Sequence, residues 1–277
     1  MLKKNLPMNS ENLDISGKVI ALIGSTGILG TQYVHYLASK GAKIVIGDVN
    51  IETCNDYAEK VRAEYNCEAL PLHIDVYDED SIIKFYSDLN DHFGKLDVVI
   101  NNSQVKPKGF YDSFENYSKE TLMRVIEGNT VGLAISCREA CKIFTKQGYG
   151  IIVNVASIYG VVGADQRLYD GVENIYNPGE RFSSPVSYAI SKAGVVNMTK
   201  YLASYYRDSN IRVNCLTPGG VLDDHDDTFN KNYSDRTLLG RMANRDEYNG
   251  AIHFLVSDSS SYMTGSNLVV DGGWTAI

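Results

Sequence analysis

The stretch Gly24-Ser25-Thr26-Gly27-Ile28-Leu29-Gly30 stands between a short apolar run, Lys18–Ile23, and a segment of helical periodicity, Ile28–Lys40. Glycine permits a tight turn and lets the backbone approach a ligand closely. The N–H groups at the start of the helix, together with its dipole, favour a bound pyrophosphate. Glycines in this position predict a dinucleotide site, and a merely tight turn is the alternative. The residues expected to contact the dinucleotide here are Gly24, Thr26, Gly27, Ile28, Leu29 and Gly30.

Apolar runs and amphipathic segments continue to alternate along the rest of the chain. The runs that predict strands are Lys18–Ile23, Lys43–Gly47, Ala69–Ile74, Leu96–Ile100, Gly150–Val155, Ile211–Cys215 and Asn267–Val270. The intervening segments are long enough for crossover helices, so neighbouring strands should be parallel and covered on both faces. The pattern predicts an α/β Rossmann fold, with a doubly wound, mostly parallel sheet of about seven strands between helices.

Length and charge narrow the classes of protein to consider. We expect one domain over residues 17–277 of the 277, preceded by an extended leader over residues 1–16. A net charge of −8 and a pI near 5.2 argue against binding to nucleic acid or anionic membranes. No apolar run approaches the roughly 20 residues of a membrane span. Five cysteines without a C-x-x-C pair indicate reduced thiols and no metal site, which predicts a cytoplasmic protein.

Two aspartates follow predicted strands and bear on the cofactor. Asp48 ends the second strand, 18 residues after Gly30. A carboxylate there accepts hydrogen bonds from the adenosine-ribose hydroxyls and repels a 2′-phosphate, which favours NAD(H) over NADP(H). The alternative is a loop cap. Asp75 follows the third strand and is expected either to accept from the adenine amino group or to cap the next helix.

Tyr188 and Lys192 are four residues apart in an apolar-periodic helix and therefore share one face. A phenol has an ordinary pKa near 10, and a neighbouring ammonium is expected to lower it. Tyr188 would then exchange a proton with an alcohol or carbonyl oxygen, and Ser157, after the Ile151–Val155 run, would hydrogen-bond that oxygen. Taken separately, such a tyrosine–lysine pair usually lies on the protein surface without a catalytic role, and a serine after a strand usually forms part of a turn.

These motifs together resemble the short-chain dehydrogenase/reductase family over residues 17–277. Tyr188-Ala189-Ile190-Ser191-Lys192 is similar to the family's YxxxK motif, and Asn154-Val155-Ala156-Ser157 to its serine strand. Further matches are Asn129 in Asn129-Thr130-Val131-Gly132, Pro218-Gly219 after Arg212-Val213-Asn214, and the ending Val269-Val270-Asp271-Gly272-Gly273-Trp274.

The resemblance implies roles for several residues. Asn129, Ser157, Tyr188 and Lys192 would form the catalytic set, with Asn129 holding a water and proton relay and Lys192 also binding the nicotinamide ribose. Further cofactor contacts are expected from Val76, Asn101, Pro218, Gly219 and Val221. Relatives are commonly homotetramers or homodimers, so we expect a homo-oligomer that acts on a small-molecule substrate.

The chain also departs from the family pattern at three places. The glycine motif reads GxxGxxG, whereas usual relatives carry TGxxxGxG, and the NNAG motif becomes Asn101-Asn102-Ser103-Gln104. Asp223 stands where the family often has a threonine. An aspartate cannot donate to a phosphate and would repel it unless it is turned away.

Two irregular stretches, residues 159–186 and 219–238, follow predicted strands and are expected to be lids over the substrate. The first carries Tyr159, Arg167, Tyr169 and Arg181, which would suit a sugar phosphate or nucleotide sugar. A surface insertion balanced by its own salt bridges is the alternative. The sequence Ala156-Ser157-Ile158-Tyr159-Gly160 resembles the corresponding sequence of bacterial oxidoreductases from surface-glycan and flagellin-modification loci.

The leading hypothesis is therefore an NAD(H)-dependent oxidoreductase that interconverts a secondary alcohol and a ketone on a sugar-type substrate. A 3-oxoacyl or generic ketone reductase is the alternative, and it requires the two loops to present a predominantly apolar lining. A non-catalytic dinucleotide-binding regulator is a further alternative, although such a protein needs no acid–base set.

Overall fold

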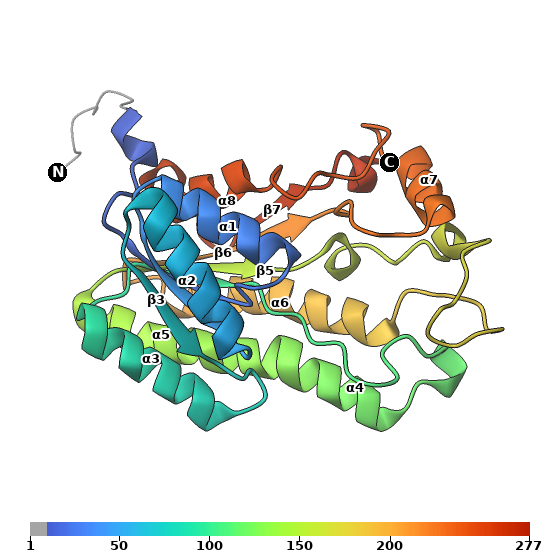
Figure 1. The fold of residues 1–277 in the computed structure, drawn as a ribbon, viewed down its shortest axis with the longest axis horizontal. Coiled ribbons are helices and arrows are strands. Elements are labelled where there is room, and N and C mark those ends of the chain that lie inside the picture. The colour runs from blue at the N-terminus through green and yellow to red at the C-terminus, as the bar shows by residue number, and fades with distance from the viewer. Residues whose placement is uncertain (1–9) are drawn as a thin grey trace.

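The computed structural model describes residues 10–277, which form a seven-stranded sheet between two layers of helices (Figure 1). The strand order is β3-β2-β1-β4-β5-β6-β7, and every neighbouring pair is parallel. The strands are β1 Val19–Ile23, β2 Lys43–Asp48, β3 Ala69–His73, β4 Val98–Asn101, β5 Gly150–Val155, β6 Ile211–Pro218 and β7 Asn267–Val270. The predicted Rossmann fold is confirmed.

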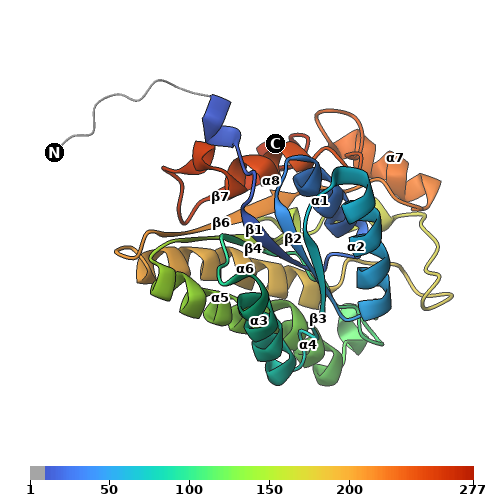
Figure 2. The same cartoon turned by 60° about the vertical axis from the view of Figure 1, so that its left-hand side comes forward.

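The helices divide between the two faces of the sheet, as Figure 2 shows with the sheet between its two layers. Helices α1, α2 and α8 cover one face, and α3, α4, α5 and α6 cover the other. The bounds are α1 Ile28–Ser39, α2 Ile51–Tyr65, α3 Glu79–Phe93, α4 Lys119–Ile126, α5 Leu133–Gln147, α6 Val186–Tyr205, α7 Asp227–Arg236 and α8 Asn249–Val256.

The strand sequences explain why both faces are covered. Along β1, Ile20 and Leu22 pack into the core below α1, α2 and α8, whereas Val19, Ala21 and Ile23 pack into the opposite core. Successive side chains of a strand point to opposite faces, so an uninterrupted apolar run needs an apolar cover on each side. The run of five buried residues therefore fixes β1 as a central strand.

The order of the strands reverses beside β1, because β1 pairs with β2 on one side and with β4 on the other. The chain leaves β1 toward one face and leaves β4 toward the other, and a crevice opens at the carboxyl ends between them. Ile23 of β1 is aligned with Gly47 of β2 and with Asn101 of β4. The segments that follow these three strands therefore meet at one edge of the sheet.

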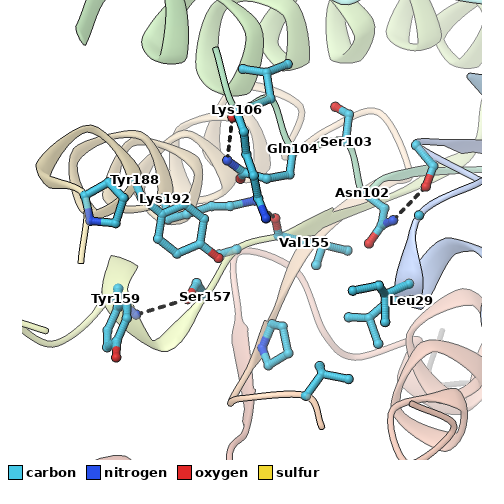
Figure 3. A pocket seen from close by; sticks show the side chains of 18 of the residues that line it. Leu29, Asn102, Ser103, Gln104, Lys106, Val155, Ser157, Tyr159, Tyr188 and Lys192 are labelled. Carbon is cyan, nitrogen blue, oxygen red and sulfur yellow. Dashed lines mark hydrogen bonds between the residues drawn. The ribbon is translucent and has the colours of Figure 1, made fainter. Parts of the chain in front are cut away.

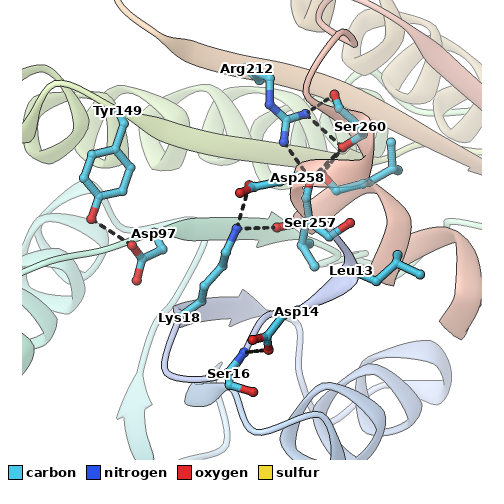
Figure 4. A network of polar contacts seen from close by, with 12 residues as sticks. Leu13, Asp14, Ser16, Lys18, Asp97, Tyr149, Arg212, Ser257, Asp258 and Ser260 are labelled. Atoms are coloured by element: carbon cyan, nitrogen blue, oxygen red, sulfur yellow. Dashed lines mark hydrogen bonds and ion pairs between the residues drawn. The ribbon is translucent and has the colours of Figure 1, made fainter. Parts of the chain in front are cut away.

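The segment before β1 differs from the expected extended leader. Residues 1–9 lie outside the described part of the chain, while Ser10–Leu13 forms a short 3-10 helix. Ile15 is 1% exposed and belongs to the core below α1 and α8. Lys18 Nζ lies 3.0 Å from Asp258 Oδ1 (Figure 4). His253 Nε2 lies 2.7 Å from the Leu13 carbonyl oxygen, so the segment is held against the end of α8.

The two expected lid segments also contain more regular structure than their sequences suggested. The 3-10 turn Ile158–Gly160 overlaps the start of residues 159–186, which also contain the turn Gln166–Tyr169. Residues 219–238 include the whole of α7. The α7 helix begins at an Asp226 cap whose carboxylate accepts from the Thr228 and Phe229 N–H groups. Both segments contribute to a third apolar cluster of the residues Ile158, Leu168, Tyr169, Tyr233, Met242 and Trp274.

Membrane spans and metal clusters are both absent from residues 10–277. No helix there is long and apolar enough to cross a membrane. Nor does that part of the chain bring together three or more histidine, cysteine, aspartate or glutamate side chains that could hold a metal ion.

The third glycine of the turn after β1 gives a test of how tightly α1 packs there. A Cβ atom at Gly30 would lie 2.2 Å from the Gly24 carbonyl oxygen, which is part of the turn itself. We expect Gly30→Ala to lower the free energy of unfolding by about 1–3 kcal/mol, because the turn must shift to admit the methyl group. Urea denaturation measures the change.

The matched control is Gly250→Ala in α8, where an added Cβ meets no atom within 4 Å. That variant should be as stable as the wild type or up to about 1 kcal/mol more stable, since alanine favours a helix. Equal stability of Gly30→Ala and Gly250→Ala would contradict the packing argument.

Candidate active site

A cavity of about 780 Å³ runs along the carboxyl edge of the sheet. It extends from Asp48 and Asp75, after β2 and β3, to the segments after β5 and β6. The sequence-predicted residues that line it are Gly24, Thr26, Gly27, Ile28, Leu29, Asp48, Asp75, Val76, Ser157, Tyr159, Tyr169, Tyr188, Lys192, Pro218, Gly219 and Val221. Gly30, Asn101, Asn129, Arg167 and Arg181 do not line it.

The glycine turn brings two loops into close backbone contact. Gly24 has φ +78°, and a Cβ there would lie 2.7 Å from both the N and Cα atoms of Ser103, after β4. Gly27 caps α1 without a side-chain hydrogen bond, so the first N–H groups of the helix remain free for a ligand. This cradle of backbone donors fits the pyrophosphate of a dinucleotide. Gly30 does not line the cavity but packs against the Gly24 carbonyl oxygen of the turn.

Asp48 closes the β2 side of this cradle. Its Oδ2 accepts a hydrogen bond from the Thr26 N–H at 3.1 Å, and its Oδ1 accepts from the Val49 N–H at 2.8 Å. The carboxylate therefore acts as a loop cap and also faces the cavity beside the glycine turn. Asp75 lines the cavity too, and its Oδ1 accepts from the Tyr77 N–H, while Asp78 supplies the cap of α3.

The two asparagines at the end of β4 occupy different places from those expected. Asn101 is 2% exposed, and its side chain donates to Asn154 Oδ1 and accepts from the Ser136 hydroxyl inside the molecule. Asn102 lines the cavity instead, and its Nδ2 donates to the Gly24 carbonyl oxygen at 2.9 Å. The alternation of side chains along a strand turns the first asparagine inward and leaves the next one at the cavity.

Ser157, Tyr188 and Lys192 come together from β5 and α6 (Figure 3). Lys192 is 3% exposed, and its Nζ donates to the Val155 carbonyl oxygen at 3.0 Å. The same Nζ lies 5.8 Å from the centre of the Tyr188 ring. Burial lowers the pKa of Lys192 to about 8, since the charged ammonium loses its hydration there.

The environment of Tyr188 differs from the expectation that an ammonium lowers its pKa. Burial raises the pKa of the Tyr188 phenol above its ordinary value, and the neighbouring Ser157 hydroxyl acts in the opposite direction. Desolvation dominates because the walls around the phenol are aromatic. Tyr159, for example, meets the Tyr188 ring edge to face at a centroid distance of 6.4 Å. In the protein without nucleotide, Tyr188 is therefore a protonated acid.

Asn129 lies in a π-helical segment, Glu127–Gly132, between α4 and α5, and does not line the cavity. Its Oδ1 accepts from the Val105 N–H at 2.9 Å, and its Nδ2 donates to the Ser191 hydroxyl at 3.3 Å. Such bulges place polar groups at functional sites. Asn129 thus connects the segment after β4 to the residue beside Lys192, which is a positioning role; the water relay remains a prediction.

The first lid presents aromatic rings to the cavity and turns its charges away from it. Arg167 pairs with Asp165, and Arg181 with Asp170, at N–O distances of 2.7 and 2.8 Å. Neither arginine lines the cavity, because each guanidinium is paired within the same segment, and their contact with a substrate stays a prediction. Tyr159 and Tyr169, by contrast, line the cavity as expected.

Asp223, which the sequence suggested would repel a phosphate, is turned away from the cavity. Its carboxylate forms an ion pair with Arg245 and is absent from the cavity lining. The glycines before it leave room for this bend, since a Cβ at Gly219 would lie 2.8 Å from the Asp271 Cα.

Several lining residues were not predicted from the sequence. They come from the segment after β4, the end of the first lid and the α7 region, and they include Lys106, Phe110, Tyr111, Ser184, Pro185, His225, Phe229, Tyr233 and Met242. Only the residues after β4 could have been predicted from the sequence. The strand order reverses between β1 and β4, so the segment after β4 must begin at this edge of the sheet. The others depend on how the lids fold back.

Comparisons with known proteins agree with this geometry. The family model "short chain dehydrogenase" matches residues 18–169, and the model "Enoyl-(Acyl carrier protein) reductase" matches residues 177–275. The cis-4-hydroxycyclohexanecarboxylate dehydrogenase of Sinomonas cyclohexanicum is 34% identical, over 94% of this chain and 97% of its own. The post-translational flagellin modification protein A of Campylobacter coli is 26% identical, over 94% of this chain and 99% of its own.

Solved structures show the same fold. A short-chain dehydrogenase from Leptospira borgpetersenii, crystallised with bound NAD+, superposes with a TM-score of 0.81 at 28% identity. The match covers 99% of this chain and 98% of that one.

The buried ammonium of Lys192 predicts a pH-dependent cost to stability. The folded state lowers the pKa of Lys192 to about 8 from its ordinary 10.5, so the cost is full below about pH 8 and disappears as the pH rises toward 10.5. We expect nucleotide-free Lys192→Met to be about 1–3 kcal/mol more stable than the wild type at neutral pH, with the difference shrinking in alkali. Urea denaturation across this pH range measures both effects.

The control is Lys200→Met, which removes an exposed ammonium from the same helix. Its stability should follow that of the wild type at every pH. A Lys192→Met protein that is less stable than the wild type at neutral pH would show that the ammonium is not a net cost.

Proposed function

The chain belongs to the short-chain dehydrogenase/reductase family, and on that premise we propose that this oxidoreductase of alcohols and ketones uses NAD(H) and acts on a compact, largely apolar ring. The observation that carries the proposal is the convergence of Ser157, Tyr188 and Lys192 at one end of a cavity whose other end is built for a dinucleotide.

The proton chemistry follows from these three side chains. A bound nicotinamide dinucleotide supplies or accepts the hydride at the reacting carbon. Tyr188 donates its phenolic proton to the carbonyl oxygen during reduction and takes the hydroxyl proton during oxidation. Ser157 hydrogen-bonds the same oxygen and orients it. The raised pKa of the Tyr188 phenol keeps it protonated in the free protein, ready for the reductive direction.

Lys192 supplies a positive charge that is held in place beside Tyr188. Its bond to the Val155 carbonyl oxygen holds the ammonium beside the Tyr188 ring, where positive charge favours the phenolate that forms when the proton leaves. The ribose of a bound nicotinamide nucleotide is expected to share the remaining donors of the same ammonium. Asn129 keeps α6 in register with the segment after β4 through Ser191 and Val105.

The lining of the lids supports the ring-shaped substrate. Both lids contribute mainly aromatic and apolar side chains to the cavity: Tyr159, Tyr169, Pro185, Val221, Phe229 and Tyr233. A predominantly apolar lining is the feature that distinguishes a ketone reductase from a sugar oxidoreductase. The Sinomonas relative, named for a hydroxycyclohexanecarboxylate, acts on such a ring. The sugar-type substrate stays a prediction, without the arginine contacts that suggested it.

The preference for NAD(H) rests on Asp48. Its carboxylate lies at the end of β2 beside the Thr26 N–H, where a 2′-phosphate would meet a negative charge. No lysine or arginine occurs at positions 25–31 or 49–52 to offset it. The Leptospira relative, which holds NAD+, is consistent with this choice.

We also propose that copies of this chain associate through the layer of helices α3 to α6, which covers one face of the sheet. Large apolar side chains are exposed on α4, α6 and the π-helical segment between α4 and α5: Met123, Val131, Ile190, Tyr201 and Tyr205. Exposed apolar patches of this kind are usually covered by a partner.

Replacing the proposed acid tests the mechanism. Tyr188→Phe should lower kcat for oxidation of cyclohexanol-type alcohols by about 10²–10⁴-fold, because the phenolic oxygen that would take the hydroxyl proton is gone while the ring remains. The affinity for NADH, measured by fluorescence titration, should stay within about twofold, since the phenyl ring keeps the cavity filled. Tyr201→Phe, on the exposed face of the same helix, is the control and should keep full activity. Turnover by Tyr188→Phe near the wild-type rate would refute the assignment.

Removing the charge at Asp48 tests the cofactor preference. Asp48→Asn should weaken the discrimination between NADH and NADPH by about tenfold or more, because repulsion of the 2′-phosphate is lost. Titration of each variant with both cofactors gives the ratio of dissociation constants. Glu52→Gln, in the first turn of α2, is the control and should keep the wild-type ratio. Tighter binding of NADPH than NADH by the wild type would overturn the proposal.

A further inference from the structure

Lys106 is a cationic side chain of the cavity to which the proposed chemistry assigns no role. It belongs to the segment after β4, and its side chain extends into the cavity (Figure 3). The other basic side chains of the lining are Lys192, which belongs to the catalytic set, and His225, before α7. No arginine lines the cavity within residues 10–277.

The ammonium of Lys106 has no anionic partner in the described part of the chain. The arginines of the lid region are each paired with a carboxylate, as for Arg167, Arg181 and Arg245. The acidic residues of the cavity lining in that part of the chain are Asp48 and Asp75, both at the nucleotide end. Lys106 is exposed, so water reaches part of its side chain, while its ammonium extends over the Tyr111 ring in the wall of the cavity. A cation beside an apolar wall attracts an anion more strongly than one in open water.

The Tyr111 ring lies beside Lys106 in the cavity. The Nζ of Lys106 lies 5.9 Å from the centre of this ring, which also lines the cavity. Tyr188 lines the same cavity. Tyr111 also stacks on Tyr176 at a centroid distance of 4.0 Å, and Asn177 Nδ2 donates to Asp112 Oδ1, so the first lid holds this ring in place.

From this arrangement we infer that Lys106 binds a carboxylate of the substrate, so that the enzyme acts on hydroxy or oxo acids built on an apolar ring. The substrate would place its hydroxyl or carbonyl carbon at Ser157 and Tyr188, its ring along Tyr111, and its carboxylate at Lys106. Lysine suits this task as a compact point charge on a flexible stem. The inference rests on the proposed function for the position of the reacting carbon.

A pair of alcohols that differ only in the carboxylate tests the inference. The probes are trans-4-hydroxycyclohexanecarboxylate and cyclohexanol, each oxidised with NAD+ by the wild type, Lys106→Met and Lys108→Met. Lys108 is exposed on the same segment and does not line the cavity, so it is the matched control. We expect Lys106→Met to lower kcat/KM for the acid by about 10- to 100-fold and to leave cyclohexanol within about twofold.

Two results of the kinetic comparison would overturn the inference. One is an equal effect of Lys106→Met on the acid and on cyclohexanol, which would indicate a structural role. The other is a loss of NADH affinity in Lys106→Met with the preference for the acid unchanged, which would place the ammonium on the cofactor. Lys108→Met should match the wild type in every measurement.

A binding measurement separates this inference from the proposed function. Cyclohexanecarboxylate, which has no hydroxyl to oxidise, is titrated by calorimetry into the NAD+-loaded wild type and both variants. Binding that is lost only in Lys106→Met supports the carboxylate site even if no ring alcohol is turned over, and that failure would then count against the proposed function alone. Equal binding by all three proteins, or none by the wild type, refutes the carboxylate site whatever the turnover.

Discussion

The contact between Gly24 and Ser103 joins the turn after β1 to the segment after β4, and so the proposed nucleotide end of the cavity to the proposed catalytic end. The two backbones approach so closely that even a methyl group at position 24 would lie 2.7 Å from Ser103. Asn102 adds a hydrogen bond to the Gly24 carbonyl oxygen. Because β4 is the strand at which the chain changes faces, this contact fixes where the segment carrying Lys106 and Tyr111 enters the cavity.

The catalytic end depends on a dry environment, which has opposite effects on its two titrating groups. Burial lowers the pKa of Lys192 to about 8 and raises that of Tyr188, so each shift is toward the neutral form, although Lys192 still carries its proton at neutral pH. The hydrogen bond from Lys192 to the Val155 carbonyl oxygen is what retains the ammonium there. The buried ammonium of Lys192 lowers the stability of the folded protein, and strongly shifted pKa values of this kind are typical of functional sites.

The lids show how charged residues can lie near a site without taking part in it. Asp165, Asp170 and Asp223 each pair with an arginine of the lid region, and this leaves aromatic rings to face the cavity. Lys106, an exposed lysine of the cavity lining, has no carboxylate partner within residues 10–277. Its isolation, more than its charge, distinguishes it from the arginines that the sequence made prominent.

The local sequence was enough to predict the strands of the sheet and the glycine turn. It also predicted that Asp48, Ser157, Tyr188 and Lys192 line one site. Strand periodicity, helix spacing and strand ends are all properties of short segments. Tertiary structure alone decided which of Asn101 and Asn102 faces the cavity, and that Arg167 and Arg181 have carboxylate partners. The fold likewise decided that Lys106 lines the cavity without such a partner in the described residues. It also decided the direction of the Tyr188 pKa shift, since desolvation depends on walls contributed by distant segments. Pairing and burial are relations between parts of the chain that only the fold brings together.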